Sequence, residues 1–168
     1  TGPFPTMNFL EQALKDIEAA GLLRTPVTVE GEQSPVIRIG SRDLVNLCSN
    51  NYLGLADHPQ LKAEAARAAL QYGVGAGASR LVSWTMALHC ELEEALAQFK
   101  GTEAALLFNS GYQCNTGVIP ALAGPNDLIF SDALNHASLI DGCRLARAPT
   151  KIYRHNDIDH LEELLRCH

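Results

Sequence analysis

Residues 104–153 read AALLFNSGYQCNTGVIPALAGPNDLIFSDALNHASLIDGCRLARAPTKIY and decide the fold class of this chain. Short apolar runs at 104–108, 128–132 and 151–153 alternate with segments whose apolar residues follow a helical period. This alternation is typical of βαβ units, in which parallel strands form a sheet covered by helices. The predicted fold class is therefore α/β with a parallel-rich sheet.

A helix and a small hairpin are predicted to precede this region. Residues 9–20 place apolar side chains at helical spacing, and Gly21 follows as a stop signal. Apolar runs on both sides of Gly40–Asp43 suit two short strands joined by a turn. Further along the chain, Asp57 is expected to cap a helix that begins near Pro59 and ends at Gly73. We therefore divide the chain into an N-terminal segment, residues 1–55, and the first part of a large domain, residues 56–168.

Composition limits the classes of partner. The 168 residues are 46% hydrophobic and 19% charged, which is typical of globular proteins. The formal charge of −6, without a Lys/Arg cluster, argues against a nucleic acid partner. The sequence contains neither a signal peptide pattern nor an apolar run of roughly 18 residues, so we predict a cytoplasmic chain without a membrane partner.

The cysteines and histidines do not suggest a metal centre. The five cysteines are far apart and lack CxxC spacing, so we expect reduced, mostly buried thiols. His155 and His160 are misaligned on a helix, and no second pair supports them. We predict no metal site.

We expect both ends of this chain to differ from the ends of the native protein. Residues 1–6 precede Met7, and we expect them to be foreign to the native sequence. The last predicted helix runs up to His168 without a capping glycine or proline, which predicts a truncated chain.

Two candidate sites follow apolar runs, where ligands of α/β sheets gather. Gly111, between Ser110 and Tyr112, allows a close approach of the main chain, whose N–H groups can bind a phosphate. A plain strand-to-helix turn with a capping serine explains these residues equally well. His136 follows the next run, where it can stack on a flat ring, exchange a proton or serve only a structural role.

Several strings resemble the α-oxoamine synthases, a family of pyridoxal-phosphate (PLP) enzymes of fold type I. The strings are Ser49–Leu55, Gly75–Arg80, His89 with Leu92–Glu93, Phe108–Tyr112 and Ser131–Gly142. The resemblance implies a fold type I PLP-dependent transferase that condenses an amino acid with an acyl-CoA thioester and releases carbon dioxide. It also implies a homodimer with active sites at the subunit interface.

The resemblance assigns a role to each candidate residue. Ser110, Gly111 and Tyr112 form the turn that holds the cofactor phosphate. His136 is the catalytic residue that stacks on the pyridine ring and meets the substrate. Asn50 contacts the amino-acid carboxylate, and Arg24, placed by spacing alone, reaches the acyl or product carboxylate.

The resemblance leaves the substrates open. L-alanine with a pimeloyl thioester is the first pair, and glycine with acetyl-CoA is the alternative. A different class, a non-catalytic module that binds a phosphate ligand, is favoured if the native chain lacks the imine-forming lysine. In the family that lysine and the pyridinium aspartate lie beyond position 168, which predicts that this stretch alone is inactive. Trp84 stands where relatives commonly have glycine.

Overall fold

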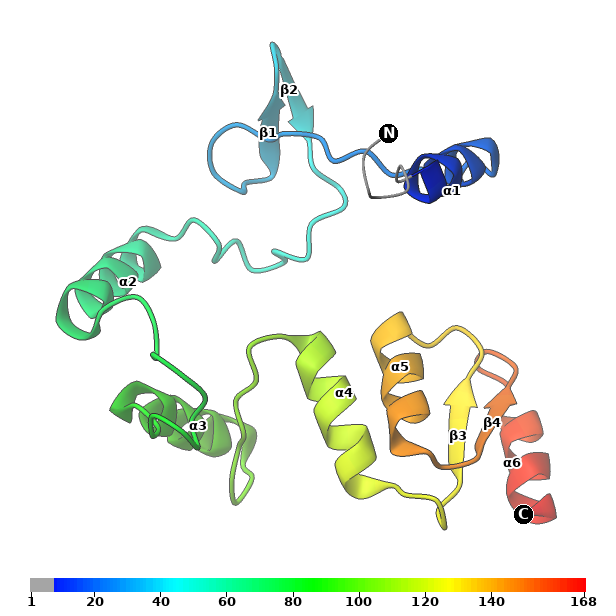
Figure 1. Ribbon diagram of the computed structural model, residues 1–168. Coiled ribbons are helices and arrows are strands. Elements are labelled where there is room, and N and C mark those ends of the chain that lie inside the picture. The colour runs from blue at the N-terminus through cyan, green and yellow to red at the C-terminus, as the bar shows by residue number, and fades with distance from the viewer. Residues whose placement is uncertain (1–7) are drawn as a thin grey trace, which may run out of the picture. The chain divides into compact units, whose positions relative to one another are not determined.

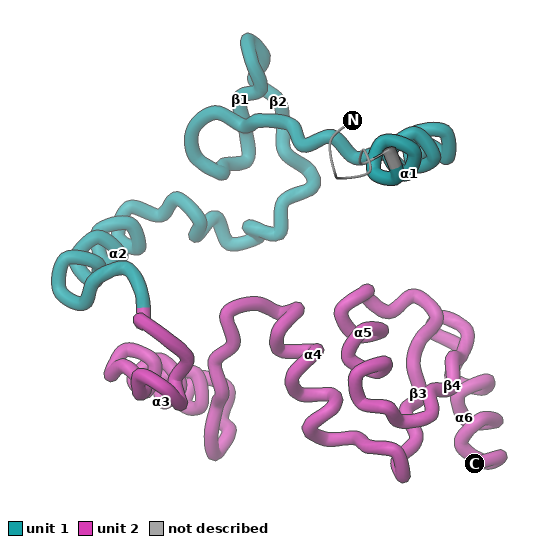
Figure 2. The backbone as a smooth tube through the Cα atoms, in the orientation of Figure 1, with its two compact units in different colours: residues 1–75 teal, residues 76–168 magenta. Residues whose placement is uncertain are grey.

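The computed structural model of the protein describes residues 8–168, so the prediction about residues 1–6 lies outside the described range. The chain forms two compact units, Thr1–Gly75 and Ala76–His168, which Figure 2 shows in teal and magenta. The domain division that we predict after residue 55 stays a prediction. No helix in the described part of the chain combines the length and apolar character that a membrane crossing requires.

The first unit contains the predicted helix and hairpin. Its elements are α1 (Asn8–Ala19), β1 (Val36–Ile39), β2 (Arg42–Val45) and α2 (Pro59–Tyr72) (Figure 1). Strands β1 and β2 pair antiparallel, with Ile39 opposite Arg42 across the two-residue turn. Gly40 in this turn has φ of +60°, a conformation that favours glycine. The predicted hairpin is confirmed.

The start of α2 differs from the sequence prediction. Asp57, which we expected to cap this helix, instead pairs with Lys62 at 2.6 Å. His58 occupies the N-cap position without a side-chain cap, and Pro59 begins the helix. The fixed φ of proline suits the first helical position, and its missing N–H needs no cap.

The second unit contains the predicted βαβ unit. Its elements are α3 (Ala87–Lys100), α4 (Gly111–Leu122), β3 (Ile129–Asp132), α5 (Ala137–Ala146), β4 (Thr150–Tyr153) and α6 (Ile158–Cys167). Strands β3 and β4 pair parallel, with Ile129 opposite Thr150 and Asp132 opposite Tyr153. Helix α5 forms the connection between them, as Figure 1 shows. This unit confirms the α/β class.

Two further expectations need correction. The apolar run 104–108 forms no strand and has no strand partner within the described residues. A strand needs the hydrogen bonds of a neighbour, and an apolar run alone does not supply them. The cysteines are not mostly buried, since only Cys143 is buried whereas Cys48 and Cys167 are exposed.

Helices α4 and α5 are packed closely because Gly142 has no side chain. A methyl group on Gly142 would lie 2.6 Å from the carbonyl oxygen of Asn115 and 2.7 Å from Cδ1 of Ile119. Contacts this short do not occur between real Cβ atoms and their neighbours. On the same helix, Ser138, Cys143 and Ala146 are also buried. Gly142 therefore sets the distance between the two helices.

Trp84 has an unusual backbone conformation and follows the glycine-rich loop, residues 73–80. Its φ is +69°, a region that glycine adopts freely and that costs other residues about 1–2 kcal/mol. The residue is 80% exposed, so packing of the indole within the described chain does little to offset this cost. The conformation explains why a glycine suits this position.

We predict that Gly142→Ala lowers the free energy of unfolding by about 1–2 kcal/mol, because overpacking outweighs the gain of about 1 kcal/mol in helix propensity. Urea denaturation measures this change. Gly124→Ala is the matched control, because its methyl group would have Asp127 Oδ2 at 3.9 Å as its nearest neighbour. A Gly142→Ala protein as stable as the wild type would contradict the close packing of α4 and α5.

Candidate functional site

The turn at residues 110–112 presents free main-chain amides. Ser110 is the N-cap of α4, and its Oγ accepts a hydrogen bond from the Gln113 amide at 3.2 Å. Within residues 8–168 the amides of Gly111 and Tyr112 have no acceptor. A Cβ on Gly111 would meet no atom within 4 Å, so the space beside this turn is open. An anion can therefore approach the positive end of α4.

Tyr112 connects this turn to α5. Its hydroxyl donates to Oδ2 of Asp141 at 3.0 Å, and this hydrogen bond to a carboxylate raises the pKa of Tyr112. Asp141 also accepts from Nη1 of Arg144 at 3.2 Å. The Tyr112 hydroxyl is therefore engaged in holding the two helices together, while the amide of the same residue stays free.

His136 is held by hydrogen bonds that fix its ring. It is the N-cap of α5, and its Nδ1 accepts from the Ser138 amide at 3.2 Å. The Ser138 hydroxyl lies 2.7 Å from the same Nδ1 and accepts from Nδ2 of Asn115 at 2.9 Å. Since an amide N–H can only donate, Nδ1 must be the unprotonated nitrogen. The neutral ring therefore carries its hydrogen on Nε2.

Ser138 is the buried centre of this arrangement. It is only 1% exposed, and it joins Asn115 of α4 to His136 at the start of α5. A buried hydroxyl with both its donor and its acceptor satisfied favours one geometry over alternatives. The orientation of His136 is thus coupled to the position of α4.

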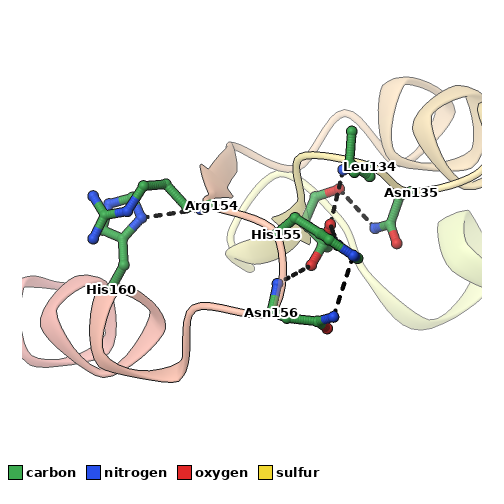
Figure 3. A network of polar contacts seen from close by, with 8 residues as sticks. Leu134, Asn135, Arg154, His155, Asn156 and His160 are labelled. Atoms are coloured by element: carbon green, nitrogen blue, oxygen red, sulfur yellow. Dashed lines mark hydrogen bonds and ion pairs between the residues drawn. The ribbon is translucent and has the colours of Figure 1, made fainter.

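Asp132 holds the loop between β3 and α5, and Figure 3 labels its hydrogen-bond partners Leu134, His155 and Asn156. Oδ1 of Asp132 accepts from the Leu134 amide at 2.8 Å and pairs with Nδ1 of His155 at 2.9 Å. Its Oδ2 accepts from the Asn156 amide at 3.1 Å. The Leu134 amide contributes most to lowering the pKa of Asp132, followed by His155. This carboxylate therefore ties the loop that ends at His136 to the loop that follows β4.

Helices α4 and α5 begin at the end of the sheet where β3 and β4 finish (Figure 1). The hydrogen bonds Tyr112–Asp141 and Asn115–Ser138 hold the two helix starts side by side. The structure thus brings the turn 110–112 and His136 to one edge of the sheet. Arg24 and Asn50 are exposed residues of the first unit, and their roles stay predictions.

Glu93 holds the chain that leads into the turn, and we made no prediction for it from the sequence. Its Oε1 accepts from Nη1 of Arg80 at 2.6 Å and from the Leu107 amide at 2.8 Å. Its Oε2 accepts from Nη2 of Arg80 at 3.0 Å. The Arg80 hydrogen bonds and the Leu107 amide lower the pKa of Glu93 to about 2. The sequence feature that could have pointed to Glu93 is its position on the predicted helix, next to the apolar residues Leu92 and Leu96.

Residues 8–168 contain no group of three or more His, Cys, Asp or Glu side chains placed to hold a metal ion. The polar groups at the sheet edge are amides, a hydroxyl and an imidazole. This donor set is suited to an anionic, aromatic ligand.

We predict that neutral His136 carries its hydrogen on Nε2. Imidazole ¹⁵N NMR at a pH where the ring is neutral measures this, and Nδ1 should show the shift of an unprotonated nitrogen. His160 is an internal reference, because its Nδ1 accepts from the Arg154 amide at 3.0 Å and requires the same tautomer. A hydrogen on Nδ1 of His136 would contradict the Ser138 contacts.

Comparisons with known proteins agree with this geometry. The sequence model described as "Aminotransferase class I and II" matches residues 42–168. An 8-amino-7-oxononanoate synthase from Geobacter sulfurreducens is 58% identical over 155 residues, which are 92% of this chain and 40% of that protein. The chain thus spans about 40% of the length of the curated relatives it matches.

Solved structures show the same fold. A serine palmitoyltransferase variant from S. paucimobilis, solved with bound PLP-myriocin aldimine, has a TM-score of 0.83 and 30% identity, and the match covers 99% of this chain and 42% of that one. An 8-amino-7-oxononanoate synthase from Francisella tularensis has a TM-score of 0.61 and 27% identity, with coverage of 70% and 32%. With three quarters of its length matched by the family model, this chain belongs to the aminotransferase class I and II family, with a fold type I architecture.

Proposed function

We propose that this chain forms the phosphate-binding and ring-stacking part of a PLP-dependent 8-amino-7-oxononanoate synthase. The reaction is the decarboxylative condensation of L-alanine with a pimeloyl thioester, carried by CoA or a carrier protein, in biotin biosynthesis. One observation carries the proposal: the open amides of Gly111 and Tyr112 share a sheet edge with His136, whose orientation Ser138 fixes. The 58% identity to a synthase of this kind supports the choice of substrates.

The residues of the turn fit the phosphate of PLP. The helix dipole and the two free amides favour an anion, and each charge-assisted hydrogen bond contributes roughly 1.5–3 kcal/mol. Ser110 caps the helix through the Gln113 amide and so leaves the amides of Gly111 and Tyr112 to the phosphate. The turn therefore anchors the cofactor by its main chain rather than by a basic side chain.

His136 is the proposed catalytic residue, and its imidazole would stack on the pyridine ring of bound PLP. When bound, PLP supplies an electron sink for the charge that develops at the substrate α-carbon. His136 keeps the ring in place, and its Nε2–H remains available as a donor because Nδ1 is engaged with Ser138. We assign the amino-acid carboxylate to Asn50 and the acyl or product carboxylate to Arg24.

Further parts of the proposal concern the complete enzyme. We propose a cytoplasmic homodimer that takes an amino acid and an acyl-CoA thioester. The imine-forming lysine and the pyridinium aspartate are assigned to sequence after residue 168, since the resemblance matches none of the lysines of this chain to that role. Residues 1–168 alone are then inactive.

Product analysis with the complete gene product tests the substrates. L-alanine with pimeloyl-CoA should give 8-amino-7-oxononanoate, whereas glycine with acetyl-CoA and L-serine with palmitoyl-CoA should give little product. Activity only with glycine and acetyl-CoA would make the protein a glycine C-acetyltransferase. Failure to retain PLP would favour a non-catalytic module that binds a phosphate ligand.

We predict that Gly111→Val abolishes PLP retention, because the branched side chain fills the open space over the amides. The yellow absorbance of the complete protein after gel filtration measures retention. Gly124→Val, beyond the opposite end of α4, is the control and should keep the colour. A Gly111→Val protein that stays yellow would contradict the phosphate site.

A further inference from the structure

We propose that Glu93 is a positioning residue for the phosphate turn. Together with Arg80 it fixes the course of residues 107–109 and thereby aims the amides of Gly111 and Tyr112. This inference rests on the proposed function, because it takes the turn as the phosphate site. It adds a role for α3, whose side chains touch neither the turn nor His136 in the hydrogen bonds described above.

The carboxylate of Glu93 joins two segments that are distant in sequence. Oε1 is shared between Nη1 of Arg80, at 2.6 Å, and the Leu107 amide, at 2.8 Å. The Glu93 side chain is 15% exposed and that of Arg80 is 33% exposed. Partial burial strengthens such hydrogen bonds relative to those of a solvated ion pair. The Glu93 carboxylate therefore connects Arg80, at the end of the glycine-rich loop, to Leu107, in the segment that precedes α4.

Each of the three guanidinium nitrogens of Arg80 donates a hydrogen bond in this arrangement. Its Nη1 and Nη2 bind Glu93, and its Nε donates to Oγ1 of Thr85 at 2.8 Å. The fork of an arginine has a fixed geometry, so these contacts orient Arg80 along the loop. A guanidinium held in this way supports Glu93 rather than reaching for an anionic ligand.

The link from Glu93 to the turn is short. A Cβ on Gly117 would lie 3.3 Å from Cε1 of Phe108, so the Phe108 ring lies against α4. With Leu107 bound to Glu93 and Phe108 against α4, only Asn109 separates these anchors from the N-cap Ser110. Loss of the Leu107 contact therefore shifts the direction of the amides that follow. Only two residues, Phe108 and Asn109, lie between Leu107 and Ser110, so little chain is available to absorb such a shift.

A purely structural ion pair makes a different prediction. It would stabilise the whole protein, so its loss would weaken every ligand of the site to the same degree. A residue that orients the amides of the phosphate turn affects the affinity for only those ligands that carry a phosphate. Comparison of PLP with pyridoxal, which has the same ring without the phosphate, separates the two roles.

The experiment uses the complete gene product freed of cofactor and measures the dissociation constants of PLP and pyridoxal. Glu93→Ala removes both contacts, and Glu93→Gln keeps an acceptor for Leu107 without the charge that holds Arg80. We expect Glu93→Ala to weaken PLP at least about tenfold, the scale of one misdirected charge-assisted hydrogen bond, and Glu93→Gln to weaken it less. Pyridoxal should bind all variants within about twofold of the wild type, since it makes no phosphate contact.

Glu94→Gln is the matched control, because Glu94 is the exposed neighbour on α3, and it should leave both constants unchanged. Equal weakening of PLP and pyridoxal, or no weakening of either, would overturn the role of Glu93. If Glu93→Ala fails to fold by circular dichroism, the same comparison with Glu93→Gln decides. A wild-type protein that does not prefer PLP to pyridoxal would refute the phosphate site itself, an outcome distinct from a failure of Glu93 alone.

Discussion

The close approach of α4 and α5 at Gly142 is the constraint on which the site depends. Where any other residue would place a Cβ, the carbonyl oxygen of Asn115 lies 2.6 Å away. The two helices therefore meet backbone to backbone at Gly142 and Asn115, and Nδ2 of Asn115 donates a hydrogen bond to Oγ of Ser138 at 2.9 Å. Their N-terminal ends open at one edge of the sheet because β3 leads directly into α5 (Figure 1). A larger side chain at Gly142 would move the turn 110–112 away from His136.

Polar side chains hold the loops around this contact. Ser138 orients the imidazole, Asp132 holds the loop before it, and Glu93 holds the chain before the turn. Each is a short side chain with several partners, so each restrains more than one segment. Such satisfied polar groups contribute modest net stability, about 0.5–1.5 kcal/mol for a neutral hydrogen bond, but they favour one arrangement. The amides of Gly111 and Tyr112 differ from these groups, since they have no acceptor within residues 8–168.

Local signals in the sequence predicted the structural features around the candidate site that depend on neighbouring residues. The N-cap role of Ser110 and the turn at Gly111 could be predicted because an N-cap acts within three residues. The hairpin and the βαβ unit followed from apolar periodicity, and His136 followed from its position after a strand. Hydrogen bonds between residues that are distant in the sequence could not be predicted from local patterns. Glu93 binds Leu107 fourteen residues away, and Asp132 binds His155 beyond the next helix.

The errors have the same origin. Asp57 satisfied the local rule for a cap, yet Lys62 offered its carboxylate a charged partner. The run 104–108 has the composition of a strand. A strand must also pair with a neighbouring strand, and the local sequence does not identify that partner.

A crystal structure of the complete gene product with PLP would locate the cofactor phosphate. We expect the phosphate within about 3 Å of the main-chain nitrogens of Gly111 and Tyr112, with the imidazole of His136 over the pyridine ring. A phosphate bound elsewhere, with water at those two amides, would contradict this expectation.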